Sequence, residues 1–359
     1  MISPLSPCVE ICLDALATGT GAQLPSQPRG RTSVRASVGI LALWASLVFG
    51  PLHAADLTLA DGVVVKFGTD AGLTARDRIA TEGTVVLTSL NDASVGGATI
   101  MGGPAASPGD WRGVAIEPGA YVADIEIDGI DIRYAGGSGG AGLSFGRLPF
   151  DLDQISVSQC TIGVRAVQGG TALLNGMRLY NNSVGLRVEG NATPRVTDSE
   201  IVGNSVLGVD NATPATVVIA TGNWWGHPSG PLDPVGNPAG QGNGVSAGVD
   251  YGQFLPGVPL VNCSVRASNG QYAVIRRDVS LALACRNAIE YRLAESTNFG
   301  AAPFIPMAAS ATLTLSAGGG TKPVYAQFRG AQGQTKTVAT PQPFIYSPTS
   351  PVVALLAPP

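Results

Sequence analysis

Charge is scarce in this chain of 359 residues, and histidine is almost absent. Asp, Glu, Lys and Arg make up 13% of the sequence, whereas an ordinary soluble protein has about 25%. The net charge is −4 and the arginines are scattered, which argues against a nucleic-acid-binding protein. Of the two histidines, His53 lies in a predicted leader. A histidine-based zinc site is therefore excluded, and a Ser-His-Asp triad would have to centre on His227.

Long hydrophobic runs are also missing, since no stretch reaches the ~20 residues of a membrane span. An apolar run of 12 residues, 38–49, follows three arginines and precedes the small residues Ala54 and Ala55. This order is typical of a secretory signal peptide, with cleavage after Ala54 or Ala55. We therefore predict that residues 1–54 are a leader and signal peptide. The mature chain should be exported to the periplasm, cell surface or medium, without a membrane span. An uncleaved anchor or a buried strand is the alternative interpretation.

The composition is wrong for a helical bundle, because the chain has 48 glycines and 26 prolines. Short segments that alternate apolar and polar residues instead predict many strands joined by tight turns. In the middle of the chain these segments recur at a step of roughly 22 residues, in three columns. The columns are Gly142, Gly163, Gly185 and Gly208; Ile132, Val157, Leu179 and Ile201; and Cys160, Asn182 and Asn204.

A repeat of this length cannot bury an apolar face alone, so its copies must stack. The pattern predicts an all-β fold, a parallel β-helix with one repeat per coil and the Ile/Val/Leu column inside. Because glycine and asparagine tolerate left-handed backbone, we expect the glycine column to mark a corner. Asn182 and Asn204 should occupy left-handed turns.

A resemblance becomes specific at Asn223–Pro231 (NWWGHPSGP) and Gly248–Tyr251. These residues resemble the closing segment of secreted bacterial right-handed parallel β-helix proteins of the pectate-lyase-like superfamily. Three upstream segments resemble the first coils of these proteins, namely Val63–Phe67, Leu87–Asp92 and Pro108–Gly113. The resemblance implies a right-handed β-helix over residues 55–256. It places Trp224 and Trp225 in the core of the closing coil rather than on a sugar-binding surface. The superfamily includes lyases, hydrolases and adhesins, so the fold alone does not define the function.

A second domain is predicted over residues 257–340. Alternating segments around Val279–Cys285 and Val324–Phe328 are spaced as in a β-sandwich. Gly320–Arg329 is similar to the last hairpin of bacterial immunoglobulin-like modules. Residues 341–359 form a predicted Pro-rich tail. Within the sandwich, Cys263 and Cys285 could form a disulfide or remain two buried thiols.

Two groups of outward residues are candidates for binding. Arg165, Arg187 and Asp210 form one column, and Arg178 stacks on Glu200 in another. One interpretation is a carbohydrate-binding groove in which the arginines contact carboxylates of an acidic polysaccharide. The other is a set of inter-coil charge pairs, Arg178–Glu200 and Arg187–Asp210, each contributing ~0–1 kcal/mol.

Asp124, Glu126 and Asp128 lie on one face of a predicted strand and are a weak alternative as calcium ligands. Alternate residues of a strand are ~6.6–6.8 Å apart, too far to share one ion unaided. We therefore predict no cofactor and no catalytic residue.

The leading hypothesis is an exported, non-catalytic binding or structural protein. Its expected partner is a polysaccharide or another cell-surface component, and we expect a monomer. The alternative is a polysaccharide lyase or glycoside hydrolase acting on an acidic polysaccharide. The resemblance implies that such a lyase would use calcium held by acidic residues beside an Arg or Lys base. Arg133 would then be the first candidate for that base.

Overall fold

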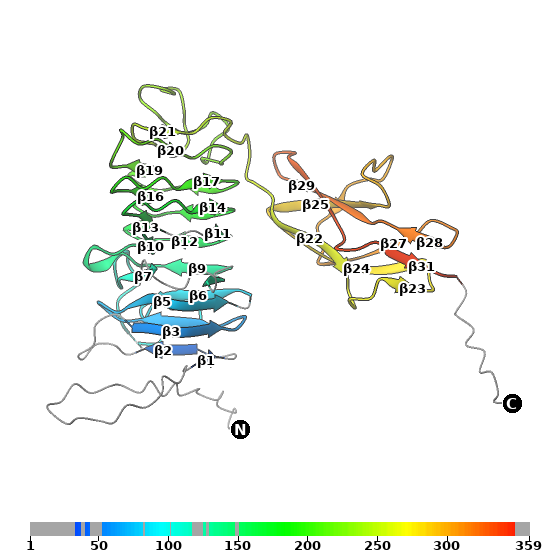
Figure 1. The fold of residues 1–359 in the computed structure, drawn as a ribbon, viewed down its shortest axis with the longest axis horizontal. Coiled ribbons are helices and arrows are strands. Elements are labelled where there is room, and N and C mark those ends of the chain that lie inside the picture. Colours follow the sequence, from blue (N-terminus) through cyan, green and yellow to red (C-terminus); the bar gives the residue numbers. More distant parts are fainter. Residues whose placement is uncertain are drawn as a thin grey trace. The chain divides into compact units, whose positions relative to one another are not determined.

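The computed structural model describes residues 33–36, 40–43, 52–81, 83–100, 102–116, 125–126, 129–147 and 151–348. Strands and turns dominate these residues, which confirms an all-β fold, and their one helical segment is the 3-10 turn η2 (Gly137–Gly139). The chain divides into two compact units between Pro256 and Gly257 (Figure 1).

Three parallel sheets build the first unit. The nine-stranded sheet has the order β1-β3-β5-β7-β10-β13-β16-β19, with β8 beside β5. Its strands are β1 (Ser33–Ala36), β3 (Leu52–Leu59), β5 (Gly72–Thr81), β7 (Gly113–Ile116), β8 (Ile125–Glu126), β10 (Leu143–Phe145), β13 (Ile162–Ala166), β16 (Val184–Val188) and β19 (Leu207–Asn211).

The seven-stranded sheet has the order β18-β15-β12-β9-β6-β4-β2. Its strands are β2 (Ile40–Leu43), β4 (Val64–Phe67), β6 (Val85–Ser89), β9 (Ile130–Arg133), β12 (Ser156–Ser158), β15 (Arg178–Tyr180) and β18 (Glu200–Val202). The third sheet consists, in order, of β11 (Leu152–Asp153), β14 (Leu173–Asn175), β17 (Arg195–Thr197), β20 (Val218–Ile219) and β21 (Val249–Asp250).

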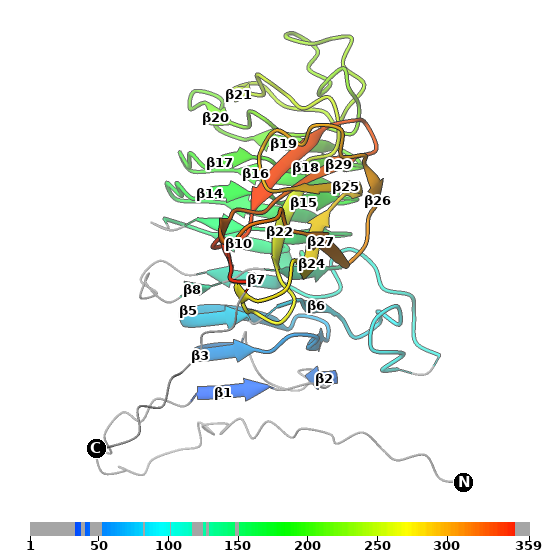
Figure 2. The same ribbon diagram turned by 90° about the vertical axis from the view of Figure 1, so that its right-hand side faces the viewer.

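The register of these strands reproduces the sequence repeat. The predicted apolar column Ile132, Val157, Leu179 and Ile201 runs across β9, β12, β15 and β18, and every member is buried. In the nine-stranded sheet, Leu186 pairs with Val164 on one side and Val209 on the other. Figures 1 and 2 show the strands stacked rung upon rung within this unit. Their inward side chains form one continuous core from Leu59 to Val245.

The prediction that left-handed backbone selects the glycine column is wrong. The left-handed residues of the corner are Gln159, Asn181 and Gly203, whereas Gly163 and Gly185 do not have positive φ. A Cβ on Gly185 would lie 2.5 Å from the carbonyl oxygen of Gly208. These glycines are required because the next coil approaches too closely for any side chain.

The prediction for Asn182 and Asn204 is wrong by one position, because the preceding residues, Asn181 and Gly203, adopt the left-handed conformation. Both asparagines instead point inward and form an amide ladder. Asn182 Nδ2 donates to Asn204 Oδ1 at 3.0 Å, and Asn204 Nδ2 donates to Asn243 Oδ1 at 2.8 Å. The ladder also accepts backbone N–H groups, including that of Cys160. Buried amides are tolerated here because their polar atoms have partners.

The two ends of the stacked strands can be compared with the predictions for the closing segment and the leader. Trp224 and Trp225 are buried in the closing turns, as predicted. At the other end, β1 and β2 lie inside the predicted leader and pair in parallel with β3 and β4. The predicted cleavage site after Ala54 or Ala55 falls within β3. Most of residues 1–51 lie outside the described residues, so removal of the leader stays a prediction.

The second unit contains three small sheets, in which most strand pairs are antiparallel. Their orders are β22-β24-β27, β23-β31-β28 and β26-β25-β29-β30. The strands are β22 (Val261–Ala267), β23 (Ala273–Val274), β24 (Asp278–Arg286), β25 (Ala288–Ala294), β26 (Ile305–Pro306), β27 (Ser310–Thr314), β28 (Gly320–Lys322), β29 (Tyr325–Gly330), β30 (Thr335–Ala339) and β31 (Phe344–Tyr346).

The structure resolves one open question about this unit and corrects one prediction. Cys263 and Cys285 form a disulfide between β22 and β24. The strand β31 lies in the segment predicted as a tail. It belongs to the sheet because Phe344 and Tyr346 are buried while Ile345 is exposed, the alternation of a half-buried strand. Residues 349–359 lie outside the described residues.

Candidate functional site

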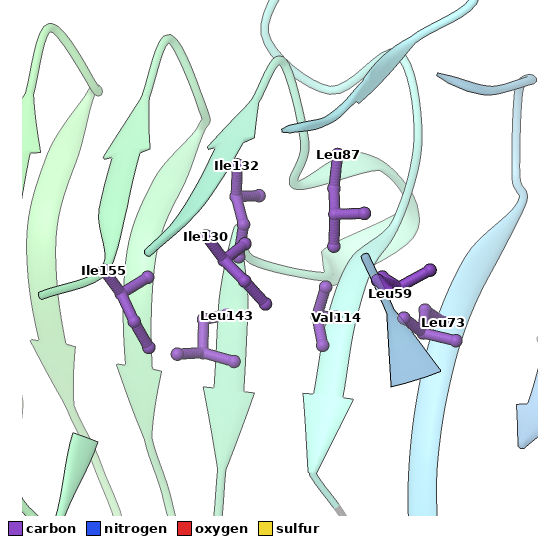
Figure 3. A pocket seen from close by; sticks show the side chains of 8 residues that line it. All are labelled: Leu59, Leu73, Leu87, Val114, Ile130, Ile132, Leu143 and Ile155. Carbon is purple, nitrogen blue, oxygen red and sulfur yellow. The ribbon is translucent and has the colours of Figure 1, made fainter. Parts of the chain in front are cut away.

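A small cavity lies in the interior of the parallel unit, among the residues that the structure describes. This cavity measures about 10 Å³, the size of a single water. Only apolar side chains line it (Figure 3), namely Leu59, Leu73, Leu87, Val114, Ile130, Ile132, Leu143 and Ile155. The polar groups that a ligand could reach are outward residues of the strands.

On the seven-stranded sheet, two rows of outward residues flank the buried Ile132 column. One row runs Asp131, Ser156, Arg178, Glu200, and the other runs Arg133, Ser158, Tyr180, Val202. Strand alternation fixes both rows, because residues on either side of a buried position point outward. We call this surface the arginine–tyrosine face.

Arg133 holds two carboxylates at one end of the face. Its Nε donates to Asp131 Oδ2 at 2.9 Å, and its Nη1 lies 4.0 Å from Asp92 Oδ2. The hydrogen bond to Asp131 is the main cause of a raised pKa for Arg133. Burial raises the pKa of Asp92, but hydrogen bonds from Ser94 and Thr88 and the charge of Arg133 outweigh it, so the pKa is lowered. Asp92 is therefore held as the anion.

The other end of the face contains the predicted pair. Arg178 Nε donates to Glu200 Oε2 at 3.1 Å, so the residues that the sequence places 22 apart do meet on adjacent coils. The Arg178 guanidinium also lies over the Tyr180 ring, 4.6 Å from its centroid. A cation on an aromatic face gains electrostatic attraction. The pair and the ring together fix the direction of the Arg178 side chain.

The nine-stranded sheet carries a second outward row, here called the arginine ladder. Its strand residues are Ser144, Arg165, Arg187 and Asp210, in the predicted order. Arg187 Nη1 donates to Asp210 Oδ2 at 3.1 Å. Glu189 joins the ladder, because its carboxylate accepts from Arg165 at 2.7 Å and from Arg187 at 2.5 Å. Partial burial raises the pKa of Glu189, but the bonds from Arg165 and Arg187 lower it below its ordinary value.

The predicted residues thus form charge pairs, which is the second of the two interpretations, although carbohydrate binding at them stays a prediction. The calcium prediction at Asp124, Glu126 and Asp128 concerns side chains outside the described residues. Among the residues that are described, no group of three or more His, Cys, Asp or Glu side chains could hold a metal ion. Nor does any helix of the described chain have the length and apolarity to cross a membrane.

Sequence reasoning missed Glu189, Tyr180 and Asp92 and gave Arg133 only a conditional role. The signal for Tyr180 and Arg133 was present, because each directly follows a member of the buried Ile132 column. Glu189 lies just past the end of β16, where strand alternation no longer indicates direction. Asp92 lies in an insertion after β6 that lacks any repeat.

Comparison with protein-family models, curated proteins and solved structures finds no match to this chain. The class that the chain defines therefore depends on its own fold and surface. It is an all-β protein whose first unit stacks a sequence repeat in parallel sheets and exposes ordered rows of paired charges.

Proposed function

We propose that this chain is an exported, non-catalytic carbohydrate-binding protein. In this proposal its first unit is a right-handed parallel β-helix of the pectate-lyase-like kind, and its second unit is an immunoglobulin-like β-sandwich. The 22-residue repeat, the parallel sheets and the NWWGHPSGP segment support the first assignment. The Cys263–Cys285 disulfide supports export, since disulfides persist in oxidising compartments.

The observation that carries the proposal is the pairing of the outward arginines. Arg133, Arg165, Arg178 and Arg187 each contact a carboxylate on their own or a neighbouring coil. The result is a surface of fixed, alternating donors and acceptors. Guanidinium N–H groups and carboxylate lone pairs left over from these pairs suit the hydroxyl groups of a sugar chain.

The proposed contact residues are Arg165, Arg187 and Asp210 in the ladder and Arg178 and Glu200 on the face. Tyr180 adds an aromatic ring between them and Arg133. Because equivalent residues of successive coils lie ~4.8 Å apart, the rows present a repeating pattern. A repeating pattern favours an extended polymer over a single small sugar.

The carboxylates favour binding over catalysis. A general acid at neutral pH needs a carboxyl with a raised pKa. The pKa values of Asp92 and Glu189 are instead lowered, for the reasons given above. Asp233 also has a lowered pKa, chiefly because the backbone N–H of Val235 donates to it. These three groups stay ionised, and the two that are partly exposed, Glu189 and Asp233, can accept hydrogen bonds from sugar hydroxyls.

A glycan array probed with the exported chain tests this proposal. We expect retention of polysaccharide probes by the wild type and a loss of about tenfold or more in Arg178→Ala, since a hydrogen bond to a charged group contributes ~1.5–3 kcal/mol. Arg266→Ala is the matched control, because Arg266 is an exposed arginine of the second unit. An array without any retained glycan, or equal binding by Arg178→Ala, would refute the proposal.

A further inference from the structure

Lys66 occupies an unusual position, because it points outward from β4 and yet is completely buried. Its neighbours Val65 and Phe67 belong to the core, so alternation directs Lys66 away from it. The side chain nevertheless has 0% exposure. Lysine is almost never fully buried unless it is paired. Some other part of the chain must therefore cover this side of β4.

The cover is the segment that follows β6, here called the strap, residues 92–97. Lys66 Nζ donates to the carbonyl oxygen of Asp92 at 2.6 Å and to that of Gly97 at 2.5 Å. These two bonds fix the two ends of the strap. Among the described residues, no carboxylate lies within ion-pair distance of Lys66, so backbone carbonyls are its direct partners.

Two further strands hold the same segment. Thr88 Oγ1 on β6 donates to Asp92 Oδ2 at 2.7 Å, and the Ser94 backbone N–H donates to Asp92 Oδ1 at 2.9 Å. Lys66 and Thr88 are register partners. Arg133 on β9 contacts Asp92 and Ser94. The strap is thus attached to outward residues of β4, β6 and β9 in succession.

These contacts connect Lys66 to the arginine–tyrosine face. The strap covers the outward side of β4 and β6, and the arginine–tyrosine face begins next to it at Arg133, whose side chain is 22% exposed. Asp92 and Ser94 therefore form the border of the surface that we assign to carbohydrate binding. A displaced strap would remove one partner of Arg133 and uncover the buried lysine.

We propose that Lys66 is a positioning residue that latches the strap over β4 and β6 and so sets the border of the carbohydrate-binding face. The inference about the border rests on the proposed function, whereas the latch itself depends only on the contacts of Lys66. When the strap opens, Lys66 meets water and the two carbonyls lose their donor.

The latch has a definite pH dependence. Burial lowers the pKa of Lys66 when the strap is closed, and the charge of Asp92 offsets only part of this effect. The charged group facing Lys66 is Asp92 on the strap. Asp92 is also contacted by Arg133 of β9, which is itself paired with Asp131. An open strap returns Lys66 to its ordinary pKa. The open state then binds more protons, so a rise in pH toward that ordinary value favours the closed strap.

Hydrogen–deuterium exchange of peptides covering residues 92–97 tests the latch without any ligand. In Lys66→Met, which keeps a long apolar side chain, we expect strap amides to exchange at least about tenfold faster. Peptides from β6 and β9 should keep their protection. Lys336→Met is the matched control, since Lys336 is exposed in the second unit. Unchanged strap protection in folded Lys66→Met would overturn the proposal.

If Lys66→Met fails to fold, hydrogen exchange of the wild type at several pH values tests the latch instead. Protection factors of the strap should rise as the pH is raised toward the ordinary lysine pKa of 10.5, by at most about tenfold per pH unit. A fall over this range would overturn the proposal. The glycan array is a separate readout. Strap opening in Lys66→Met without glycan binding by the wild type would leave the latch intact and refute the proposed function.

Discussion

A comparison of Leu186→Asp with Arg187→Ala tests the coil register directly. The two residues are adjacent in the chain, but the first change should cost much more stability than the second. Leu186 has 0% exposure and lies between Val164 and Val209 in the core. The change forfeits the ~1.5–3 kcal/mol of a buried leucine. It also buries an unpaired carboxylate, at a cost of several kcal/mol more. The total approaches the ~5–15 kcal/mol stability of a typical domain.

Arg187 points outward from the same strand. Its ion pairs with Glu189 and Asp210 are partly exposed, and pairs of this kind contribute ~0–1 kcal/mol. Urea unfolding, followed by the fluorescence of the buried Trp111 and Trp225, should therefore separate the two variants by at least ~4 kcal/mol. Leu186→Met is a volume-conserving control and should cost under ~1.5 kcal/mol. Equal losses for Leu186→Asp and Arg187→Ala would refute the register.

Four further predictions concern other parts of the chain. Gly185→Ala should lower the melting temperature by several degrees, because its Cβ would lie 2.5 Å from the Gly208 carbonyl; an unchanged melt would contradict the close approach. Folding lowers the pKa of Glu189, so its stabilising effect should be present above its ordinary pKa and vanish as pH falls through the lowered value. Glu189→Gln should therefore be less stable than the wild type at pH 7 and equally stable in acid. Urea titrations at several pH values measure this difference. Cys263→Ser with Cys285→Ser should destabilise the second unit by about 3 kcal/mol and leave exchange protection in the first unit unaltered. Terminal sequencing of exported protein should find Ala55 or Asp56 first, and an intact 38–49 segment would argue for a retained strand instead.

The interior of the first unit could be predicted from the sequence because strand alternation leaves little choice. Once Ile132, Val157, Leu179 and Ile201 are aligned at their spacing, their neighbours must point outward. This is why Arg178 and Glu200 were placed correctly on adjacent coils. The same rule applied one residue further would have identified Arg133 and Tyr180.

The corners were less predictable, because glycine is selected for two different reasons. A left-handed turn favours a missing Cβ and a close approach requires one, and sequence alone does not separate the two reasons. Gly203 has the first reason and Gly185 the second. The inward Asn182 and Asn204 likewise match turn residues in type, and only the stacking of coils reveals their ladder.

The strap could not be predicted at all. Residues 92–97 have no periodicity, so nothing in the sequence indicates that they fold back over β4. Strand alternation directs Lys66 away from the core, and nothing in the sequence shows that this side of the strand is covered. The burial of Lys66 depends on contacts with residues 26 and 31 positions away.

The central claim is that the chain binds a polysaccharide without cleaving it. A single incubation measures both binding and cleavage. The chain is mixed with an acidic polysaccharide from the glycan array, and the bound fraction and the absorbance of unsaturated uronides are followed together. The account predicts saturable binding, weakened by Arg178→Ala, with flat absorbance and no shortening of the polymer over many binding equilibration times. A steady rise in absorbance, or progressive shortening of the polymer, would contradict it and establish a lyase or a hydrolase.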